Sequence, residues 1–361
     1  MSSVSTTAAP ELDRLVERLR TGGDRAPVDQ VLAAVAAWRR PLRIQVTGRA
    51  RAGKSTLLRA LALLSAEETP PVDEPDVPVP VLDADLIVYV LGGALRDGDR
   101  GVLATLPADR TVVVLNKADA VGTGWSEVVA TAGQCARGIA MPVFPVVADL
   151  AARTRAGIPD QHELTVLARH TAAADSLTLT PELFTAATAG TDVDDRAALL
   201  DRWGLYGVAC ALAALRHQPD LGPQSLLQVL HAGSGIDELY AELHTRYEQV
   251  TARRGGEFLD ELARIAARAV SGGARELIED YLAGTEAKWL GLCAGLAQPE
   301  VRHLGAGYPQ PYPADADDAL TRARRWRAVV ASDLPPAARR AAVRVHNGYV
   351  QLWERMSGAG L

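Results

Sequence analysis

The sequence contains few cysteines and few aromatic residues. Three of its 361 residues are cysteine, and Phe, Trp and Tyr together make up 5%. Cys135, Cys210 and Cys293 lie too far apart along the chain for metal-ligand spacing, and they imply no disulfide framework. We therefore expect three buried free thiols rather than a cysteine-based metal site or a fold held by disulfides.

The sequence also lacks a basic overall charge, a signal peptide and a membrane span. The net charge of −6 gives no general field that favours nucleic acid, so no nucleic-acid partner is expected. Residues 1–7 lack a basic segment followed by an apolar core, and no stretch approaches the length of an apolar membrane span. A cytoplasmic protein is therefore the expectation.

A complete phosphate-binding loop is the most informative motif that is present. It stands between a β-branched, apolar run at 43–47 and a run of helix formers at 56–64, which is the context that the motif requires. Its glycines let the backbone approach phosphates, and Lys54 is expected to reach the β and γ phosphates while Ser55 ligates Mg²⁺. The predicted nucleotide-binding residues of this segment are Gly48, Arg49, Ala50, Arg51, Ala52, Gly53, Lys54, Ser55 and Thr56.

A second motif, Asn-Lys-Ala-Asp at 116–119, follows another buried-strand run and predicts a guanine base. The Asp119 carboxylate can accept two hydrogen bonds from the guanine edge, whereas adenine lacks those donors. Asn116 is expected to tie this turn to the phosphate loop, and the stem of Lys117 to cover the base. Ala148 is the candidate for a backbone N–H that contacts the guanine carbonyl. The two motifs together predict GTP or GDP with Mg²⁺.

The chain is predicted to combine an α/β nucleotide domain with a helical bundle. Strand and helix patterns alternate over 41–155, which favours a mainly parallel sheet flanked by helices. Residues 156–361 are helical almost throughout, and the two amphipathic helices expected within 1–40 should pack on that bundle. The predicted strands are 43–47, 86–91, 111–115 and 143–147.

These motifs resemble the bacterial dynamin-like GTPases, particularly those of actinobacteria, within the TRAFAC-type P-loop GTPase superfamily. The resemblance implies a GTPase head on a helical stalk and nucleotide-dependent pairing of heads, as a homodimer or with a full-length dynamin-like partner. It also implies a membrane-related role. The segments that carry it are 46–61, 84–90, 114–119, 199–208 and 234–239.

One departure from that family concerns the switch segments, which supply a Thr and an Asp-x-x-Gly turn to Mg²⁺ and the γ-phosphate. Here the interval 65–85 is short, acidic and proline-rich, and it contains no Asp-x-x-Gly. We expect a largely extended connection, because its prolines argue against a central strand. Asp83 is the candidate for the missing Mg²⁺ or catalytic carboxylate, and an exposed turn aspartate is the other interpretation.

Arg51 occupies the loop position from which an arginine can act as a finger in cis on the transferring phosphoryl group. A solvated side chain, or an ion pair across a head-to-head interface, is the alternative. The sequence thus favours a GTP-binding protein that hydrolyses GTP slowly or with a partner's help. Two alternatives stay open: a catalytically impaired regulatory subunit that pairs with another dynamin-like GTPase, and a P-loop kinase or ATPase in which 116–119 is incidental.

The C-terminal region 318–361 is basic. Its arginines alternate with apolar residues in a pattern typical of amphipathic helices. Such a helix can form the polar face of a bundle, or it can make peripheral contact with anionic lipid at the inner face of the membrane. The arginines are Arg322, Arg324, Arg325, Arg327, Arg339, Arg340, Arg344 and Arg355.

Overall fold

A computed structural model gives the fold, and its described residues divide into two compact units. One unit comprises residues 43–244, and the other comprises residues 1–42 and 245–361. The described residues are 10–21, 25–63, 66–75, 78–122, 124–173, 177–269, 272–305, 307–308 and 310–358.

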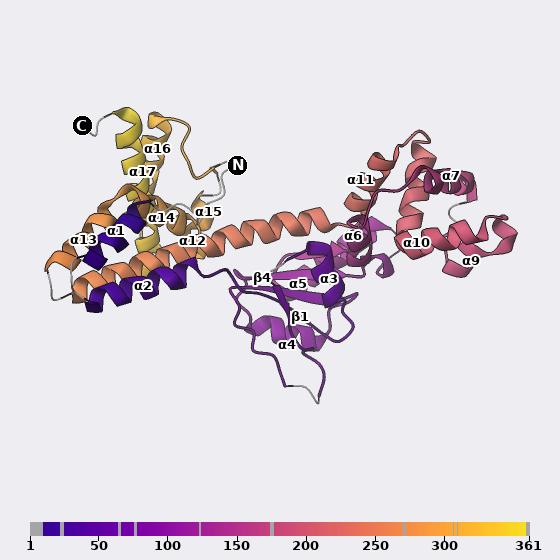
Figure 1. The fold of residues 1–361 in the computed structure, drawn as a ribbon, viewed down its shortest axis with the longest axis horizontal. Helices are drawn as coiled ribbons and strands as arrows, with labels where there is room; N and C mark the ends of the chain where they lie inside the picture. Colours follow the sequence, from indigo (N-terminus) through magenta and orange to yellow (C-terminus); the bar gives the residue numbers. More distant parts are fainter. Residues whose placement is uncertain are drawn as a thin grey trace. The chain divides into compact units, whose positions relative to one another are not determined.

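The unit of residues 43–244 is built on a sheet with helices packed around it (Figure 1). The sheet has five parallel strands in the order β2-β1-β3-β4-β5. The four strands predicted from sequence are confirmed, and with them the α/β class. The register aligns Ile44 with Leu86 and Gly48 with Val90, so neighbouring strands end at a common edge. The strands are β1 (Ile44–Gly48), β2 (Ala66–Glu68), β3 (Leu86–Gly92), β4 (Thr111–Asn116) and β5 (Val143–Val146).

Helices cover both faces of this sheet, which explains why strands β3 and β4 are almost continuous apolar runs. Side chains alternate between the faces, so Val88 and Val114 pack with α3 (Lys54–Leu61), α6 (Ala148–Thr154) and the start of α12 (Ile236–Arg268). Tyr89 and Val113 face the opposite side. There they pack with α4 (Asp97–Thr105) and α5 (Trp125–Ile139).

The sequence did not predict the short strand β2. Its three residues include two glutamates, which have low strand propensity, so the local signal is weak. After β2 the chain still follows β1: the Thr69 N–H donates to the Val46 carbonyl at 3.0 Å, and the Val72 N–H donates to the Gly48 carbonyl at 3.3 Å. The connection therefore reaches the carboxyl end of β1 before it turns back towards β3.

Helices within 156–244 also belong to this unit, so its limit does not coincide with the predicted boundary at 155. They share a core with Val147 and Leu150, beside the sheet. The start of α12 follows them. These helices are α7 (Gln161–His170), α9 (Pro181–Thr185), α10 (Val193–His217) and α11 (Pro223–Gly233), with the short 3-10 turns η2 (Thr171–Ala173) and η3 (Ala187–Ala189).

Contrary to the sequence expectation, one described helix, α10, is long and apolar enough by composition to cross a membrane. The helix is interrupted at Gly204, whose φ of 68° and ψ of 167° are not helical. Leu199, Trp203 and Leu212 are buried in the core that α10 shares with α7 and α11. Core packing within this unit therefore accounts for its apolar composition.

In its described part, the second unit consists of helices and the turns and loops that connect them. Leu12 and Leu15 of α1 pack with Leu262 of α12, and Trp38 of α2 stacks on Phe258 with ring centroids 4.8 Å apart. The N-terminal helices thus share a core with the C-terminal part of the chain. The helices are α1 (Pro10–Thr21), α2 (Arg25–Arg39), most of α12, α13 (Gly272–Ala283), α14 (Thr285–Leu296), α15 (Pro299–Gly305), α16 (Ala316–Val330) and α17 (Pro336–Ser357).

Candidate functional site

The loop between β1 and α3 adopts a conformation that two glycines make accessible. Gly48 has a φ of 143°, and a Cβ there would lie 2.4 Å from the Val90 carbonyl oxygen. Gly53 has a φ of 92°, and a Cβ there would lie 2.3 Å from Nδ2 of Asn116. Both positions therefore require glycine, because of backbone conformation and because of close neighbours.

The start of α3 presents a row of unused backbone donors. The first helical bond runs from the Leu57 N–H to the Gly53 carbonyl at 3.0 Å. The amides of Lys54, Ser55 and Thr56 have no acceptor within the described part of the chain. Such amides, together with the helix dipole, favour an anion.

Lys54 is buried against the loop, with only 5% of the residue exposed. Its Nζ donates to the Gly48 carbonyl at 3.3 Å and to the Arg49 carbonyl at 3.2 Å. Ser55 and Arg51 are exposed, and Arg51 has a φ of 61° at the loop tip. No described residue pairs with the Arg51 guanidinium. The loop thus places the Lys54 ammonium group beside its amides and leaves the Arg51 guanidinium exposed to solvent.

Asn116 joins the phosphate loop to the predicted guanine-binding turn. Its Nδ2 donates to the Ala52 carbonyl at 3.0 Å, across 64 positions of sequence. Its Oδ1 accepts the Ala148 N–H at 3.1 Å. The contact with the loop agrees with the sequence expectation. The contact with Ala148 does not, because the amide assigned to the guanine carbonyl already donates within the protein.

The Asp119 carboxylate lies in η1 (Ala118–Ala120), directly after β4. No described side chain or amide from elsewhere in the chain hydrogen-bonds to it. Desolvation raises the pKa of this carboxyl, and the nearby Asp149 carboxylate raises it further. Lys117 precedes it with a φ of 59° and an exposed side chain. Apart from its own backbone amide, no described residue occupies the Asp119 carboxylate, which lies on the same edge of the sheet as the loop.

Asp83 lies at the opposite end of β1 from the phosphate loop. Its Oδ1 pairs with Nη1 of Arg43 at 3.2 Å, and Arg43 immediately precedes β1. The five residues of β1 span roughly 16 Å at the usual strand rise. The prediction that Asp83 replaces the missing Mg²⁺ or catalytic carboxylate is therefore wrong by position. Its ion pair with Arg43 supports the turn interpretation.

Asp73 is the carboxylate that the connection does bring to the loop, and the sequence interpretation missed it. Its Oδ1 accepts the Ala50 N–H at 2.8 Å, and its Oδ2 accepts Nε–H of Arg49 at 2.9 Å. The Ala50 amide and the Arg49 guanidinium lower the pKa of the Asp73 carboxyl. The backbone pairing of Val72 with Gly48 brings Asp73 to the loop, and that pairing leaves no local motif in the sequence.

Comparison with known proteins gives no family for this chain. It matches no protein-family model, and no curated protein matches its sequence. Function is therefore inferred from the loop, the turn that follows β4, and the groups around them. In the described ranges, no three or more His, Cys, Asp or Glu residues gather where they could hold a metal ion. A Mg²⁺ at this loop would depend on Ser55 and on phosphate oxygens.

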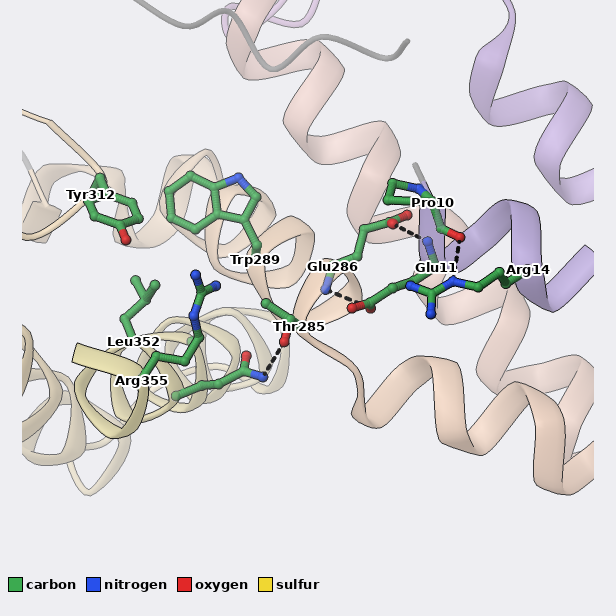
Figure 2. A pocket seen from close by; sticks show the side chains of 11 residues that line it. Pro10, Glu11, Arg14, Thr285, Glu286, Trp289, Tyr312, Leu352 and Arg355 are labelled. Carbon is green, nitrogen blue, oxygen red and sulfur yellow. Dashed lines mark hydrogen bonds between the residues drawn. The ribbon is translucent and has the colours of Figure 1, made fainter. Parts of the chain in front are cut away.

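A separate cavity of about 440 Å³ lies within the helical unit, where α1, α14 and α17 meet (Figure 2). Glu11 and Glu286 cap each other's helices: each backbone N–H donates to the other carboxylate at 3.0 Å. Arg14 and Arg355 also line the cavity and balance these two negative charges. The charge of the cavity therefore does not indicate whether it would bind an anion or a cation. Its remaining lining residues are Pro10, Thr285, Trp289, Tyr312, Gly348, Gln351 and Leu352.

Proposed function

We propose that the unit of residues 43–244 binds a guanine nucleotide, GTP or GDP, with the phosphates on the 48–56 loop and the base at Asp119. The observation that carries this proposal is the Asn116 bridge to Ala52, because it fixes two motifs that are distant in sequence side by side. The spacing of strand ends along a parallel sheet then suits an extended nucleotide.

Each phosphate contact has a defined donor in this proposal. The free amides of Lys54, Ser55 and Thr56 receive the inner phosphates at the N-terminus of α3. Lys54 exchanges its two carbonyl acceptors for phosphate oxygens, which are stronger partners for an ammonium group. Ser55 is the residue that would hold Mg²⁺, and that ion would neutralise the charge on the outer phosphates.

Base selection is assigned to Asp119. A carboxylate that no other described residue engages can accept from both donors of the guanine edge, and adenine would leave those bonds unmade. Guanine N–H donors would also favour the charged form of a carboxyl whose pKa is raised in the free protein. A nucleotide with a guanine base is therefore preferred over ATP, against the kinase or ATPase alternative.

Competition binding tests this assignment. We expect GTP to displace a fluorescent guanine nucleotide far better than ATP, and Asp119→Asn to exchange guanine for xanthine preference by on the order of 100-fold. Asp97→Asn, at the exposed start of α4, is the control and should retain guanine preference. If the wild-type protein binds ATP more tightly than GTP, the assignment of guanine as the bound base is wrong.

Hydrolysis is the less supported part of the proposal. With Asp83 at the other end of the sheet, Arg51 is the group that remains for stabilising charge on the transferring phosphoryl group. A finger needs a positioned water, and the carboxylate that lies at the loop, Asp73, already accepts from the Ala50 amide and the Arg49 guanidinium. This observation favours slow or partner-assisted turnover, and it equally supports a GTP-binding regulatory subunit that pairs with a dynamin-like GTPase through the head.

Single-turnover hydrolysis distinguishes these roles. If Arg51 acts on the transition state, Arg51→Ala should slow conversion of bound GTP to GDP by at least about tenfold without weakening GTP binding. Arg59→Ala, on the exposed side of α3, is the matched control. Equal rates for the two variants would remove the catalytic role, and GTP that stays intact in the wild-type protein would favour the regulatory subunit.

For location we propose a cytoplasmic protein, with any peripheral contact with anionic membrane made by part of the basic C-terminal region. Arg322 is internal: it pairs with Asp318 at 2.8 Å and lies over the ring of Tyr308. The exposed arginines of this region are the residues that anionic lipid would meet, and they are Arg324, Arg325, Arg327, Arg339, Arg340 and Arg355. These contacts within the helical unit support the interpretation that Arg322 belongs to the bundle and does not contact lipid.

A further inference from the structure

The phosphate loop already holds an anion that belongs to the protein. Asp73 accepts the Ala50 N–H through one carboxylate oxygen and Nε–H of Arg49 through the other. An N–H of the loop and the Arg49 side chain are thus engaged before any nucleotide binds. Hydrogen bonds to a charged acceptor are among the stronger ones, so displacing this carboxylate has a cost.

Sheet order shows which end of a nucleotide would meet this carboxylate. Asn116 ends β4 and Asp119 follows it, the phosphate loop begins at the end of β1, and Asp73 follows β2. These strands occur in the order β2-β1-β3-β4, and all are parallel. A nucleotide with its base at Asp119 therefore runs from β4 towards β1. Its terminal phosphate points to the side on which Asp73 lies.

We infer that Asp73 is a specificity-determining residue that lowers the affinity of the site for a nucleoside triphosphate relative to the diphosphate. The inference rests on the proposed guanine-nucleotide site and adds a selection by phosphate number. A diphosphate can occupy the amides at the start of α3 and leave Asp73 in place. A triphosphate must face the Asp73 carboxylate or displace it from Ala50 and Arg49, and like charges at short range repel each other.

An opposite role for Asp73 makes an opposite prediction. A carboxylate that holds Mg²⁺ beside the γ-phosphate would strengthen triphosphate binding, and its removal would weaken it. In the structure both oxygens of Asp73 are occupied by nitrogen donors of the loop. These hydrogen bonds favour the role in which Asp73 opposes the triphosphate. The two roles are separated by whether removal of the Asp73 carboxylate strengthens or weakens GTP binding.

The test compares binding of fluorescent GTP and GDP analogues, each with excess Mg²⁺, to the full chain and its Asp73→Asn variant. We expect the ratio of the GTP to the GDP dissociation constant to fall by about tenfold, the size expected when a charge-assisted contact need not be displaced. Asp83→Asn is the matched control, because it removes a carboxylate of the same connection at the far end of β1. Its ratio should stay at the wild-type value.

Each result bears on the inference. An unchanged ratio in Asp73→Asn, or weaker GTP binding with GDP binding retained, overturns it and leaves the proposed nucleotide site intact. The inference is supported most strongly if the wild-type protein binds GDP but not GTP and the Asp73→Asn variant binds both. If neither protein binds either nucleotide, the proposed function itself fails. The Asp73→Ala variant repeats the measurement without the side-chain amide that Asp73→Asn introduces. It should lower the ratio of the GTP to the GDP dissociation constant at least as far.

Discussion

The phosphate loop at 48–56 and the connection at 69–85 contrast sharply, although they meet at one edge of the same sheet. In the loop, the positive φ values of Gly48 and Gly53 and the hydrogen bonds from Lys54 to the Gly48 and Arg49 carbonyls all arise within a few residues. In the connection, Asp73 and Asp83 have similar surroundings in sequence but lie at opposite ends of β1. Local chemistry specifies the first region, whereas strand pairing specifies the second.

The largest expected effect tests the loop. Gly48→Ala should lower the free energy of unfolding by about 2–4 kcal/mol, because a Cβ would contact a fixed backbone oxygen at a left-handed φ. Gly98→Ala in α4 is the control: its Cβ would meet nothing within 4 Å, so no loss is expected. Urea denaturation followed by circular dichroism measures both. Equal stability of the two variants would contradict this account of the loop.

A smaller effect tests the charge that the loop carries. Lys54→Ala should weaken GTP binding by about 100-fold, since it removes a charge-assisted contact with the phosphates. Arg59→Ala removes an exposed cation from the same helix and should change the dissociation constant less than about threefold. Titration with a fluorescent guanine nucleotide gives both values. Similar losses in both variants would mean that general charge, and not the loop, attracts the nucleotide.

The smallest expected effect tests the connection through pH. The pKa of the Asp73 carboxyl is lowered in the folded protein, so its stabilising contribution is present above the unfolded value of about 3.9. That contribution is lost as pH falls further through the folded pKa. The thermal midpoints of wild type and Asp73→Asn should therefore differ by a constant amount from pH 5 to 8 and converge in stronger acid.

Because the Arg49–Asp73 pair is partly exposed, its contribution should stay below about 1 kcal/mol. Thermal unfolding at a series of pH values measures the difference. A difference that persists undiminished at the acid end would show that shape or packing, and not charge, accounts for the effect of Asp73.

Sequence patterns predicted most of the sheet but not its edge. The runs at β3 and β4 are apolar and buried along most of their length, as is usual for parallel strands, and β1 and β5 are shorter runs that contain β-branched residues. The three residues of β2 carry no such signal, so the strand and the path of Asp73 were missed. Apolar periodicity predicted helices within 156–244 but not that they pack beside the sheet. An apolar helix face shows that the helix is partly buried, but it does not show against which element.

The sequence by itself determined the glycine-dependent backbone of the 48–56 loop, the turn at 116–119 and the parallel α/β core, because glycine conformations and apolar periodicity act over a few residues. Tertiary structure decided which carboxylate reaches the loop and which amides are left free. Asp73, and not Asp83, lies beside Ala50, and the Ala148 amide is taken by Asn116. These outcomes depend on strand register and on hydrogen bonds between segments far apart in the chain, and neither is encoded in a local pattern.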